Sequence, residues 1–249
     1  MAGNGIRAIV AMLLLAGAVV MTLFVFLAGV TNTTPFNNTY FLQSTTQGIQ
    51  GARDITQWAY FYICAPGNLE CSGAWPAPSV GWAWVSGALN VPPELIGDFG
   101  NGTTSMYYYY MWRFGWVTYL IAFAFAVFAL LTGFLACLGR LGAALSSLLA
   151  AVSLFFYTVA AALMTVTFVK MRDALNANGY PSSIGQYAFG FTWGSFAAVF
   201  LATIIFCLGV RGDKTAGAAG SSSRFGRRRK SVRSSRSSIG SRRVKEDYA

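Results

Sequence analysis

Four apolar runs, each long enough to cross a lipid bilayer, constrain this chain more than any other feature. They occupy residues 8–30, 114–138, 141–169 and 187–210, and none contains Asp, Glu, Lys or Arg. A spanning helix needs about 20 apolar residues, and it satisfies its backbone hydrogen bonds internally because the bilayer core holds no water. We therefore predict an all-α transmembrane four-helix bundle. The alternative, four helices buried in a soluble core, needs more polar surface than 10% charged residues provide.

Two of the runs need a further comment. The run at 141–169 exceeds what a bilayer requires, so its helix is expected to tilt or to project from the membrane. The run at 8–30 follows Arg7 and could instead be a secretory signal peptide. We favour a retained helix, because Ala28-Gly29-Val30 is a poor cleavage site. Residues from Thr31 onward reach the same side in either case.

The positive charge predicts which segments face the cytoplasm. Twelve of the 18 Lys and Arg residues lie between Arg211 and Lys245, although the net charge of the whole chain is +10. Lys and Arg near the ends of spanning helices favour the cytoplasmic side. The predicted cytoplasmic segments are residues 1–7, the turn at 139–140 and the tail 211–249, and the predicted outer loops are 31–113 and 170–186.

Glycosylation motifs agree with this sidedness. The acceptor pattern Asn-x-Ser/Thr occurs at Asn32, Asn37 and Asn101, and all three lie in the loop that charge alone places outside. Lys170 and Arg172 in the second outer loop are a mild exception to the charge rule. The agreement between charge and acceptor sites favours cytoplasmic termini.

The long outer loop, residues 31–113, is predicted to fold. It is rich in Trp and Tyr, and residues 40–45, 58–64 and 80–86 alternate in the manner of half-buried strands. These segments predict a small β-sheet. The alternative is a disordered loop with scattered aromatic residues.

The four cysteines fall into two pairs. Cys64 and Cys71 lie in the loop assigned to the oxidising side, where a disulfide would contribute about 2–3 kcal/mol by closing a short loop. A zinc site needs more ligands, and the chain has no histidine. Cys137 and Cys207 lie near the predicted cytoplasmic ends of the second and fourth helices. Their position is compatible with palmitoylation and equally with buried thiols.

The fourth apolar run carries a stripe of small residues at every fourth position. Its members are Gly190, Gly194, Ala198 and Ala202. Helices approach closely along such a stripe because no side chain separates the backbones. The stripe predicts packing within the bundle or, alternatively, association with a second copy of the chain.

The tail, residues 211–249, is low in complexity and rich in Ser, Gly and Arg, so we predict it to be disordered. Basic residues held near a membrane attract anionic lipid. The predicted lipid-binding residues are Arg227, Arg228, Arg229, Lys230, Arg233 and Arg236. Ser231 follows the basic run and is a predicted phosphorylation site that would weaken this attraction. Nucleic-acid binding is the competing interpretation, which a position beside a membrane disfavours.

No residue pattern suggests catalysis, and we expect neither a cofactor nor a metal. The chain has no histidine base, its eight carboxylates are dispersed, and no Gly-rich phosphate loop is present. Charged residues, which mark ion paths and proton relays, are missing from the four runs. These features disfavour an enzyme or a proton-coupled transporter and leave open a pore lined by hydroxyl groups.

Several segments resemble the fungal eisosome tetraspan proteins, which are relatives of PalI. They are Gln47-Gly48-Ile49, residues 51–58 with Arg53 and Trp58, Asn90-Val91-Pro92, and residues 109–114 with Arg113. The resemblance covers about residues 6–210. Its signature is a Trp-to-Cys segment with a second cysteine, here Trp58, Cys64 and Cys71.

The resemblance implies a claudin-like architecture with a small outer sheet and a long third helix. It also implies a fungal plasma membrane, furrow-like eisosome domains, scaffold partners, and roles in membrane organisation and cell-wall integrity. The Gly-Leu-Trp motif of true claudins is missing, so junction-type strand formation is not implied.

Three functions are therefore compared. The first is a self-associating membrane organiser that binds anionic lipid and contacts the cell wall. The second is an accessory subunit of ambient-pH sensing, although the lack of histidine disfavours direct proton sensing. The third is a channel or carrier.

Overall fold

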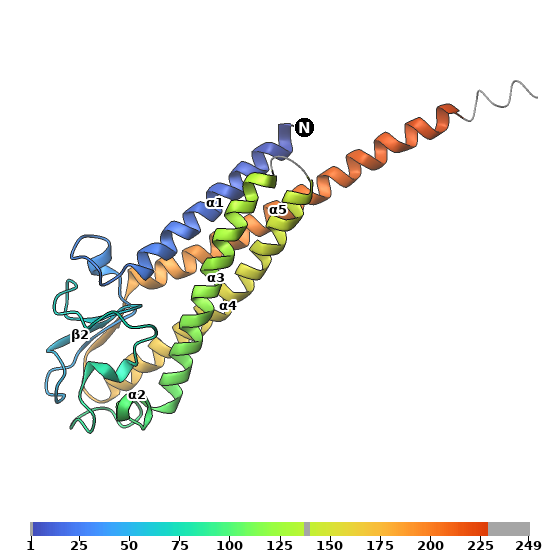
Figure 1. Ribbon diagram of the computed structural model, residues 1–249. Coiled ribbons are helices and arrows are strands. Elements are labelled where there is room, and N and C mark those ends of the chain that lie inside the picture. Colours follow the sequence, from blue (N-terminus) through green and yellow to red (C-terminus); the bar gives the residue numbers. More distant parts are fainter. Residues whose placement is uncertain (1, 137–139, 229–249) are drawn as a thin grey trace, which may run out of the picture.

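Four long helices form an elongated bundle in the computed structural model, which describes residues 2–136 and 140–228 (Figure 1). They are α1 (Ala2–Phe26), α3 (Met106–Ala136), α4 (Arg140–Ala177) and α5 (Gln186–Arg228). Within the described residues, four helices are long and apolar enough to cross a membrane. The predicted tetraspan fold is confirmed.

The helices pack along seams lined with alanine. Helix α3 packs chiefly on α4 and helix α1 on α5, and contacts of α4 with α5 and of α1 with α3 complete the bundle. The fully buried alanines are Ala11, Ala18, Ala122, Ala126, Ala129, Ala150, Ala160, Ala161, Ala188 and Ala202. Large apolar side chains such as Leu13, Phe128 and Phe155 are exposed on the outside instead. This arrangement suits a bilayer, where helix association depends on close packing because lipid tails are as apolar as leucine.

A cluster of hydroxyl groups joins three helices inside the bundle. The hydroxyl oxygens of Thr22 on α1 and Tyr157 on α4 are 2.6 Å apart. Thr22 also lies 3.2 Å from the hydroxyl of Ser195 on α5, which donates to the carbonyl of Ala18 at 3.1 Å. All three hydroxyl-bearing residues are fully buried. The hydroxyl groups thus satisfy one another between tightly packed helices.

Replacing Tyr157 by Phe should destabilise the bundle by about 0.5–2 kcal/mol, because the substitution removes one interhelical hydrogen bond in an apolar setting. The apparent unfolding temperature of the purified protein in detergent measures the effect. Thr158→Val is the matched control, because Thr158 bonds only to Leu154 of its own helix and is exposed. Equal losses in the two variants would contradict the prediction.

A small antiparallel sheet lies at one end of the bundle. Its strands are β1 (Leu42–Thr45), β2 (Ile55–Trp58), β3 (Ile63–Cys64) and β4 (Ser182–Ile184), in the order β3-β2-β1-β4. Gln43 of β1 pairs with Gln57 on one side and with Ser183 on the other. Strand β4 comes from the connection between α4 and α5, so both predicted outer loops form one unit at the same end of the molecule (Figure 1). We call residues 31–105 and 178–185 the sheet lobe.

Helices α3 and α4 extend past the bilayer to hold the sheet lobe. The 38 residues of α4 span about 57 Å, whereas the bilayer core is about 30 Å thick. The end of α4 packs against the lobe, where the rings of Phe41 and Phe168 stack with their centroids 5.0 Å apart. Trp112 of α3 lies 5.1 Å from the same Phe168 ring. The long third run therefore projects outward, in line with one of the two expectations from its length.

The predicted strands are only partly correct. Residues 58–64 form a hairpin and not one strand, because the chain reverses after Trp58 and returns as β3, with Trp58 opposite Ile63. Residues 80–86 are wrong as a strand, since Val80–Ala83 form the 3-10 helix η2. There, Gly81 packs so closely on residue 103 that a Cβ atom would lie 2.1 Å from the Thr103 carbonyl oxygen. Strand β4 was not predicted.

The predicted helix boundaries also need correction. Helix α1 ends at Phe26 and not at residue 30, α3 begins eight residues before residue 114, and α4 continues through residues 170–177. Residues 211–228, predicted to be disordered, continue α5 as helix to Arg228. Extending an existing helix avoids the cost of nucleating a new one, which explains why this polar sequence can remain helical. Residues 229–249 lie outside the described residues.

Candidate functional site

Reciprocal aromatic hydrogen bonds fasten the sheet lobe to α3. The Tyr60 hydroxyl donates to the Trp116 carbonyl at 2.7 Å, and the Trp116 indole donates to the Tyr60 carbonyl at 3.2 Å. The Trp112 indole donates to the Pro78 carbonyl at 2.8 Å. Burial raises the pKa of Tyr60 well above its ordinary value of 10, so its phenol stays protonated and remains a donor. These bonds give the lobe a defined position above the bundle.

Trp58, a residue of the loop signature, ties the sheet to the next segment of the lobe. Its side chain is buried, and its indole donates to the Val80 carbonyl at 2.9 Å. Val80 begins η2, so this bond links strand β2 to the 3-10 helix. The signature tryptophan therefore has a structural role inside the lobe.

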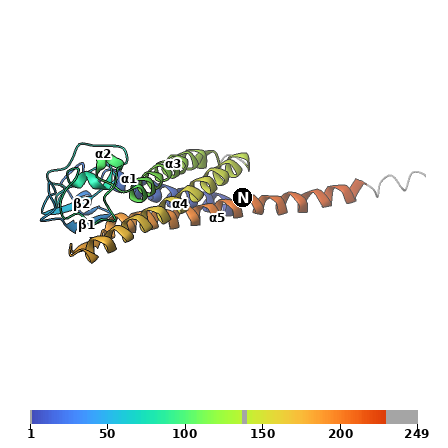
Figure 2. The same ribbon diagram turned by 90° about the horizontal axis from the view of Figure 1, so that it is seen from below.

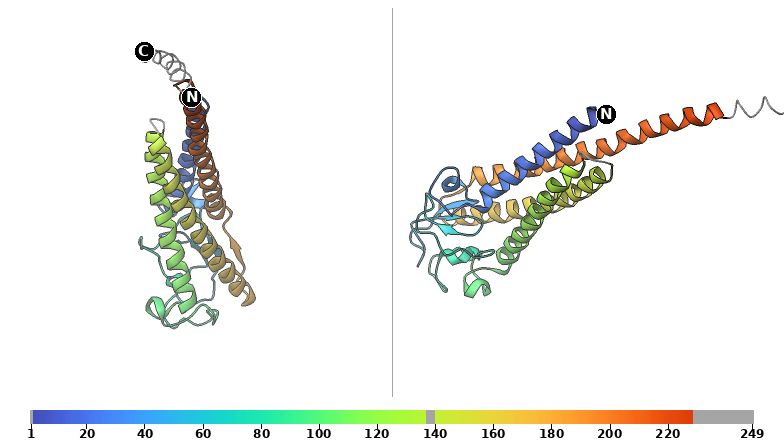
Figure 3. Two further views of the ribbon diagram at one scale, coloured as in Figure 1. Left: turned by 90° about the vertical axis from the view of Figure 1, so that its right-hand side faces the viewer. Right: turned by 45° about the horizontal axis from the view of Figure 1, so that its top comes forward.

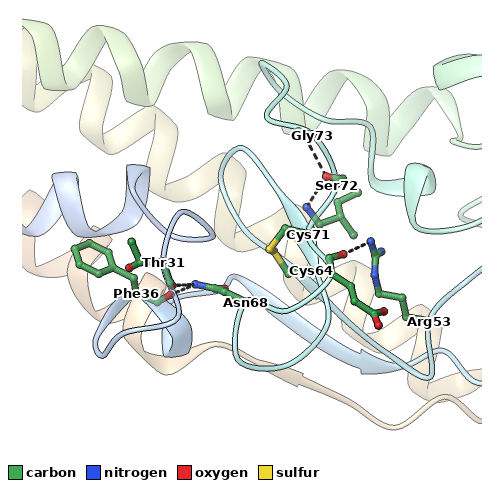
Figure 4. The surroundings of a disulfide bond; sticks show 10 residues. Thr31, Phe36, Arg53, Cys64, Asn68, Cys71, Ser72 and Gly73 are labelled. Atoms are coloured by element: carbon green, nitrogen blue, oxygen red, sulfur yellow. Dashed lines mark hydrogen bonds between the residues drawn. A yellow bond between two sulfur atoms is a disulfide. The ribbon is translucent and has the colours of Figure 1, made fainter.

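Cys64 and Cys71 form a disulfide at the edge of the sheet (Figure 4). The loop that it closes is held from two sides. Arg53, another residue of the signature, donates from its guanidinium to the Glu70 carbonyl. Asn68 donates to the carbonyls of Thr31 at 2.7 Å and Phe36 at 3.0 Å, as Figure 4 shows. The disulfide loop therefore connects β3 to the segment that follows α1.

Replacing both Cys64 and Cys71 by Ser should lower the stability of the sheet lobe by about 2–3 kcal/mol, because the unfolded chain regains the freedom of a short loop. Urea-induced exposure of the lobe to an added protease provides the measurement. Cys207→Ser is the matched control, since Cys207 is a free and exposed cysteine. A double variant as stable as the control would count against a structural disulfide.

Three tryptophans enclose an open pocket of about 580 Å³ on the sheet lobe. The lining residues are Trp75, Trp82, Trp84, Ser86, Gly100, Asn101 and Thr103. The indole groups of Trp82 and Trp84 donate to the carbonyls of Gly100 at 3.2 Å and Thr103 at 3.1 Å. Two of the three indoles thus hold the turn α2 (Phe99–Gly102) as the opposite wall of the pocket.

The structure places the three predicted glycosylation sites in different settings. Asn32 and Asn101 are exposed on the sheet lobe. Asn37 lies in the 3-10 helix η1 (Phe36–Asn38), and its side-chain oxygen is buried without a hydrogen-bond partner among the described residues. Asn101 alone of the three lines the tryptophan pocket. Glycosylation stays a prediction at each position.

The small-residue stripe of α5 divides between the bundle and the surface. A Cβ atom on Gly194 would lie 3.1 Å from the Met21 sulfur of α1, and Ala202 is fully buried. Ala198 is half-buried. Gly190 faces open space and lines a second pocket of about 380 Å³ with Gln186, Tyr187 and Phe191. The stripe therefore contributes to bundle packing at one end and leaves Gly190 available at the other.

The remaining predicted residues lie at the start of α3, along α5 or outside the described part of the chain. The guanidinium of Arg113 stacks over the Tyr109 ring at 4.2 Å, which holds this signature residue on α3. Cys207 is exposed on α5, so the buried-thiol alternative does not apply to it. Arg227 and Arg228 end α5. The predicted residues that lie outside the described part of the chain are Cys137, Arg229, Lys230, Ser231, Arg233 and Arg236.

The tryptophan pocket has no recognisable signature in the sequence. The alternation at residues 80–86 predicts a strand that contains Trp82 and Trp84, and no pattern predicts a role for Trp75. Alternation of apolar residues with a period of two also arises when every second residue is a tryptophan whose indole bonds to a distant turn. Trp82 and Trp84 bond to residues 100 and 103 in this way. The Asn-Gly-Thr acceptor at Asn101 was the only local signal in the sequence for the opposite wall.

Within the described residues, no three His, Cys, Asp or Glu side chains lie close enough together to hold a metal ion. The geometry defines the chain as a multi-pass membrane protein. It is a claudin-like tetraspan with a disulfide-containing sheet lobe at one end of the bundle. A family model supports a narrower assignment. The SUR7/PalI family model matches residues 7–205, and the chain belongs to that family.

Three curated relatives illustrate the similarity. The chain is 33% identical to the SUR7 family protein FMP45 of Saccharomyces cerevisiae, over 74% of this chain and 59% of the relative. It is 28% identical to the uncharacterized plasma membrane protein YNL194C of the same yeast, over 72% and 60%. It is 25% identical to protein SUR7 of Candida albicans, over 78% and 71%. The match spans about three-fifths of the length of the first two relatives.

Proposed function

We propose that this chain is a non-enzymatic organiser of eisosome-type domains in the plasma membrane. It associates with copies of itself, binds anionic lipid through its basic tail, and supports the cell wall. The observation that supports the proposal is that the sheet lobe and the helix leading to the basic tail lie at opposite ends of one helix bundle. The sheet lobe lies at one end, and α5 leads toward the basic tail from the other (Figure 2).

The interior of the bundle supports an organiser over a channel. The Thr22 hydroxyl lies within hydrogen-bonding distance of the Tyr157 and Ser195 hydroxyls. The Tyr119 hydroxyl lies 3.2 Å from that of Thr192. Alanine seams bring the helices together around them. Paired hydroxyls between close-packed helices are typical of a solid core. Clear conductance from the protein reconstituted into liposomes would contradict this part of the proposal.

The tail is proposed to bind the inner leaflet electrostatically. Helix α5 has 43 residues, about 64 Å, and therefore continues beyond its apolar part into a sequence containing Arg211, Lys214 and Arg224. Anionic lipid attracts each basic residue near the surface by about 1 kcal/mol. The positive-inside rule places this end in the cytoplasm. Eisosome scaffold proteins are proposed partners on the same side.

Neutralising Arg227, Arg228, Arg229 and Lys230 to Gln should reduce the phosphoinositide that co-purifies with the full-length protein about tenfold or more. The tagged variant should also leave static cortical patches, as measured by fluorescence recovery after photobleaching. Replacing the three arginines by Lys, with Lys230 kept, preserves the charge and is the matched control. Unchanged lipid retention and unchanged patches in the Gln variant would refute the role of the tail.

Phosphorylation of Ser231 should act in the same direction, because negative charge beside the basic run cancels part of its attraction for lipid. We expect Ser231→Glu to raise the mobile fraction of the tagged protein and Ser231→Ala to leave it low. The same photobleaching assay compares the two variants. A Glu variant as immobile as the Ala variant would exclude this switch.

A second candidate is an accessory role in ambient-pH signalling, which the resemblance to PalI implies. The matching family model carries the name of PalI beside that of SUR7. The chain has no histidine, so the proposed role would be assembly with a sensor and not proton binding near neutral pH. A growth defect of a deletion strain confined to alkaline medium would favour this candidate. A general loss of static patches and wall integrity would favour the organiser.

A further inference from the structure

The tryptophan pocket has an unusual composition for a water-exposed surface. Trp75 is 55% exposed, and its ring lies 5.8 Å from that of Trp82 at 82°. Among the residues that the structure describes, no charged side chain lines the pocket, and the polar side chains there are those of Ser86, Asn101 and Thr103. A large indole left facing water beside neutral polar groups is expected to contact a ligand with both an apolar face and hydroxyl groups. A neutral sugar has this chemistry.

The wall opposite the indoles carries an acceptor for a sugar. Asn101-Gly102-Thr103 is an N-glycosylation motif, and Asn101 is exposed. The residue has a φ of +64° in a turn that the indoles of Trp82 and Trp84 hold in place. The acceptor residue is therefore part of the pocket itself. Neither Asn32 nor Asn37 lines it.

We propose that Asn101 carries an N-linked glycan whose first sugar packs in this pocket against Trp75. The inference rests on the proposed extracellular position of the sheet lobe. In the transfer step, Asn101 Nδ2 forms a bond to the anomeric carbon of the first N-acetylglucosamine of a lipid-diphosphate-linked oligosaccharide. The bond from that carbon to the diphosphate oxygen breaks, the lipid diphosphate leaves, and one amide proton passes to a base of the transferase.

The covalent bond to Asn101 explains why the weak contact between the first sugar and the Trp75 indole would form in most molecules. A sugar joined to the wall of the pocket has an effective concentration in the millimolar range for the indole beside it. The C–H groups on one face of a sugar ring carry partial positive charge, which complements the negative face of an aromatic ring. The glycan would thus cover Trp75 and stabilise the turn at 99–102.

A double-mutant cycle on the full-length protein tests the proposal. Trp75→Ala is made in two backgrounds, the native protein and the Asn101→Asp variant. Asn101→Asp removes the glycan acceptor but keeps a residue type that tolerates positive φ. We expect Trp75→Ala to accelerate cleavage of the lobe by an added protease about threefold to tenfold in the native background, and to have little effect in Asn101→Asp. Asn32→Asp is the matched control background, in which the full effect of Trp75→Ala should persist.

Glycosidases give a second measurement that does not depend on folding of a variant. Treatment with an endoglycosidase that leaves the first sugar on Asn101 should preserve the protease resistance of the sheet lobe. Treatment with an amidase that removes the whole glycan should abolish that resistance. The proposal is overturned if Asn101→Asp does not change the glycosidase-sensitive mobility of the protein. It is also overturned if Trp75→Ala acts equally in both backgrounds.

A third outcome would assign the pocket to a different source of the same chemistry. If the Asn101→Asp protein retained a soluble glucan oligosaccharide, and Trp75→Ala abolished that retention, the pocket would bind a free saccharide and not its own glycan. These readouts concern the sheet lobe alone. Patch formation and lipid retention by the tail are measured separately, so failure of this inference is distinguishable from failure of the proposed function.

Discussion

Hydrogen bonds between aromatic side chains and backbone carbonyls join α3 to the sheet lobe and position the lobe above the bundle. Tyr60 and Trp116 each donate to the other's carbonyl, and Trp112 donates to Pro78. A sheet with strands of two to four residues buries little surface by itself and is marginally stable alone. It gains a core by resting on the projecting ends of α3 and α4, where Phe41 stacks on Phe168. The lobe and the bundle therefore form one folded unit (Figure 3).

Two kinds of packing meet in this molecule, and the solvent explains the difference. Inside the bilayer the helices touch along alanine seams, and buried hydroxyls bond to one another or to helix carbonyls, because an unpaired polar group is costly in hydrocarbon. In the lobe, large rings fill the core, and their indole groups bond to carbonyls of turns that no regular strand satisfies. Tryptophan side chains thus join the lobe to helix α3 and also join separate segments within the lobe.

The sequence predicted much of this architecture, and each error has its own physical cause. Helices were found because an apolar run of sufficient length has few alternatives in a bilayer. Their ends were misplaced because the turns at 106–113 and 170–177 continue the helices beyond the apolar runs, with polar and charged residues that a criterion of apolar length leaves out. The segment at 80–86 was misassigned because the alternation of its indoles serves contacts with residues 100–103, not a strand. Strand β4 has three residues, too few to carry a pattern.

Composition and periodicity alone determined the number of spans, the placement of the two outer loops on one side, and the segregation of basic charge to one end, because each depends on the transfer of whole segments between water and lipid. Only the tertiary structure decided that a strand from the second loop completes the sheet, that Gly190 stays open while Gly194 packs on Met21, and that three tryptophans surround Asn101. These outcomes depend on contacts between residues far apart in the chain, which no local pattern encodes.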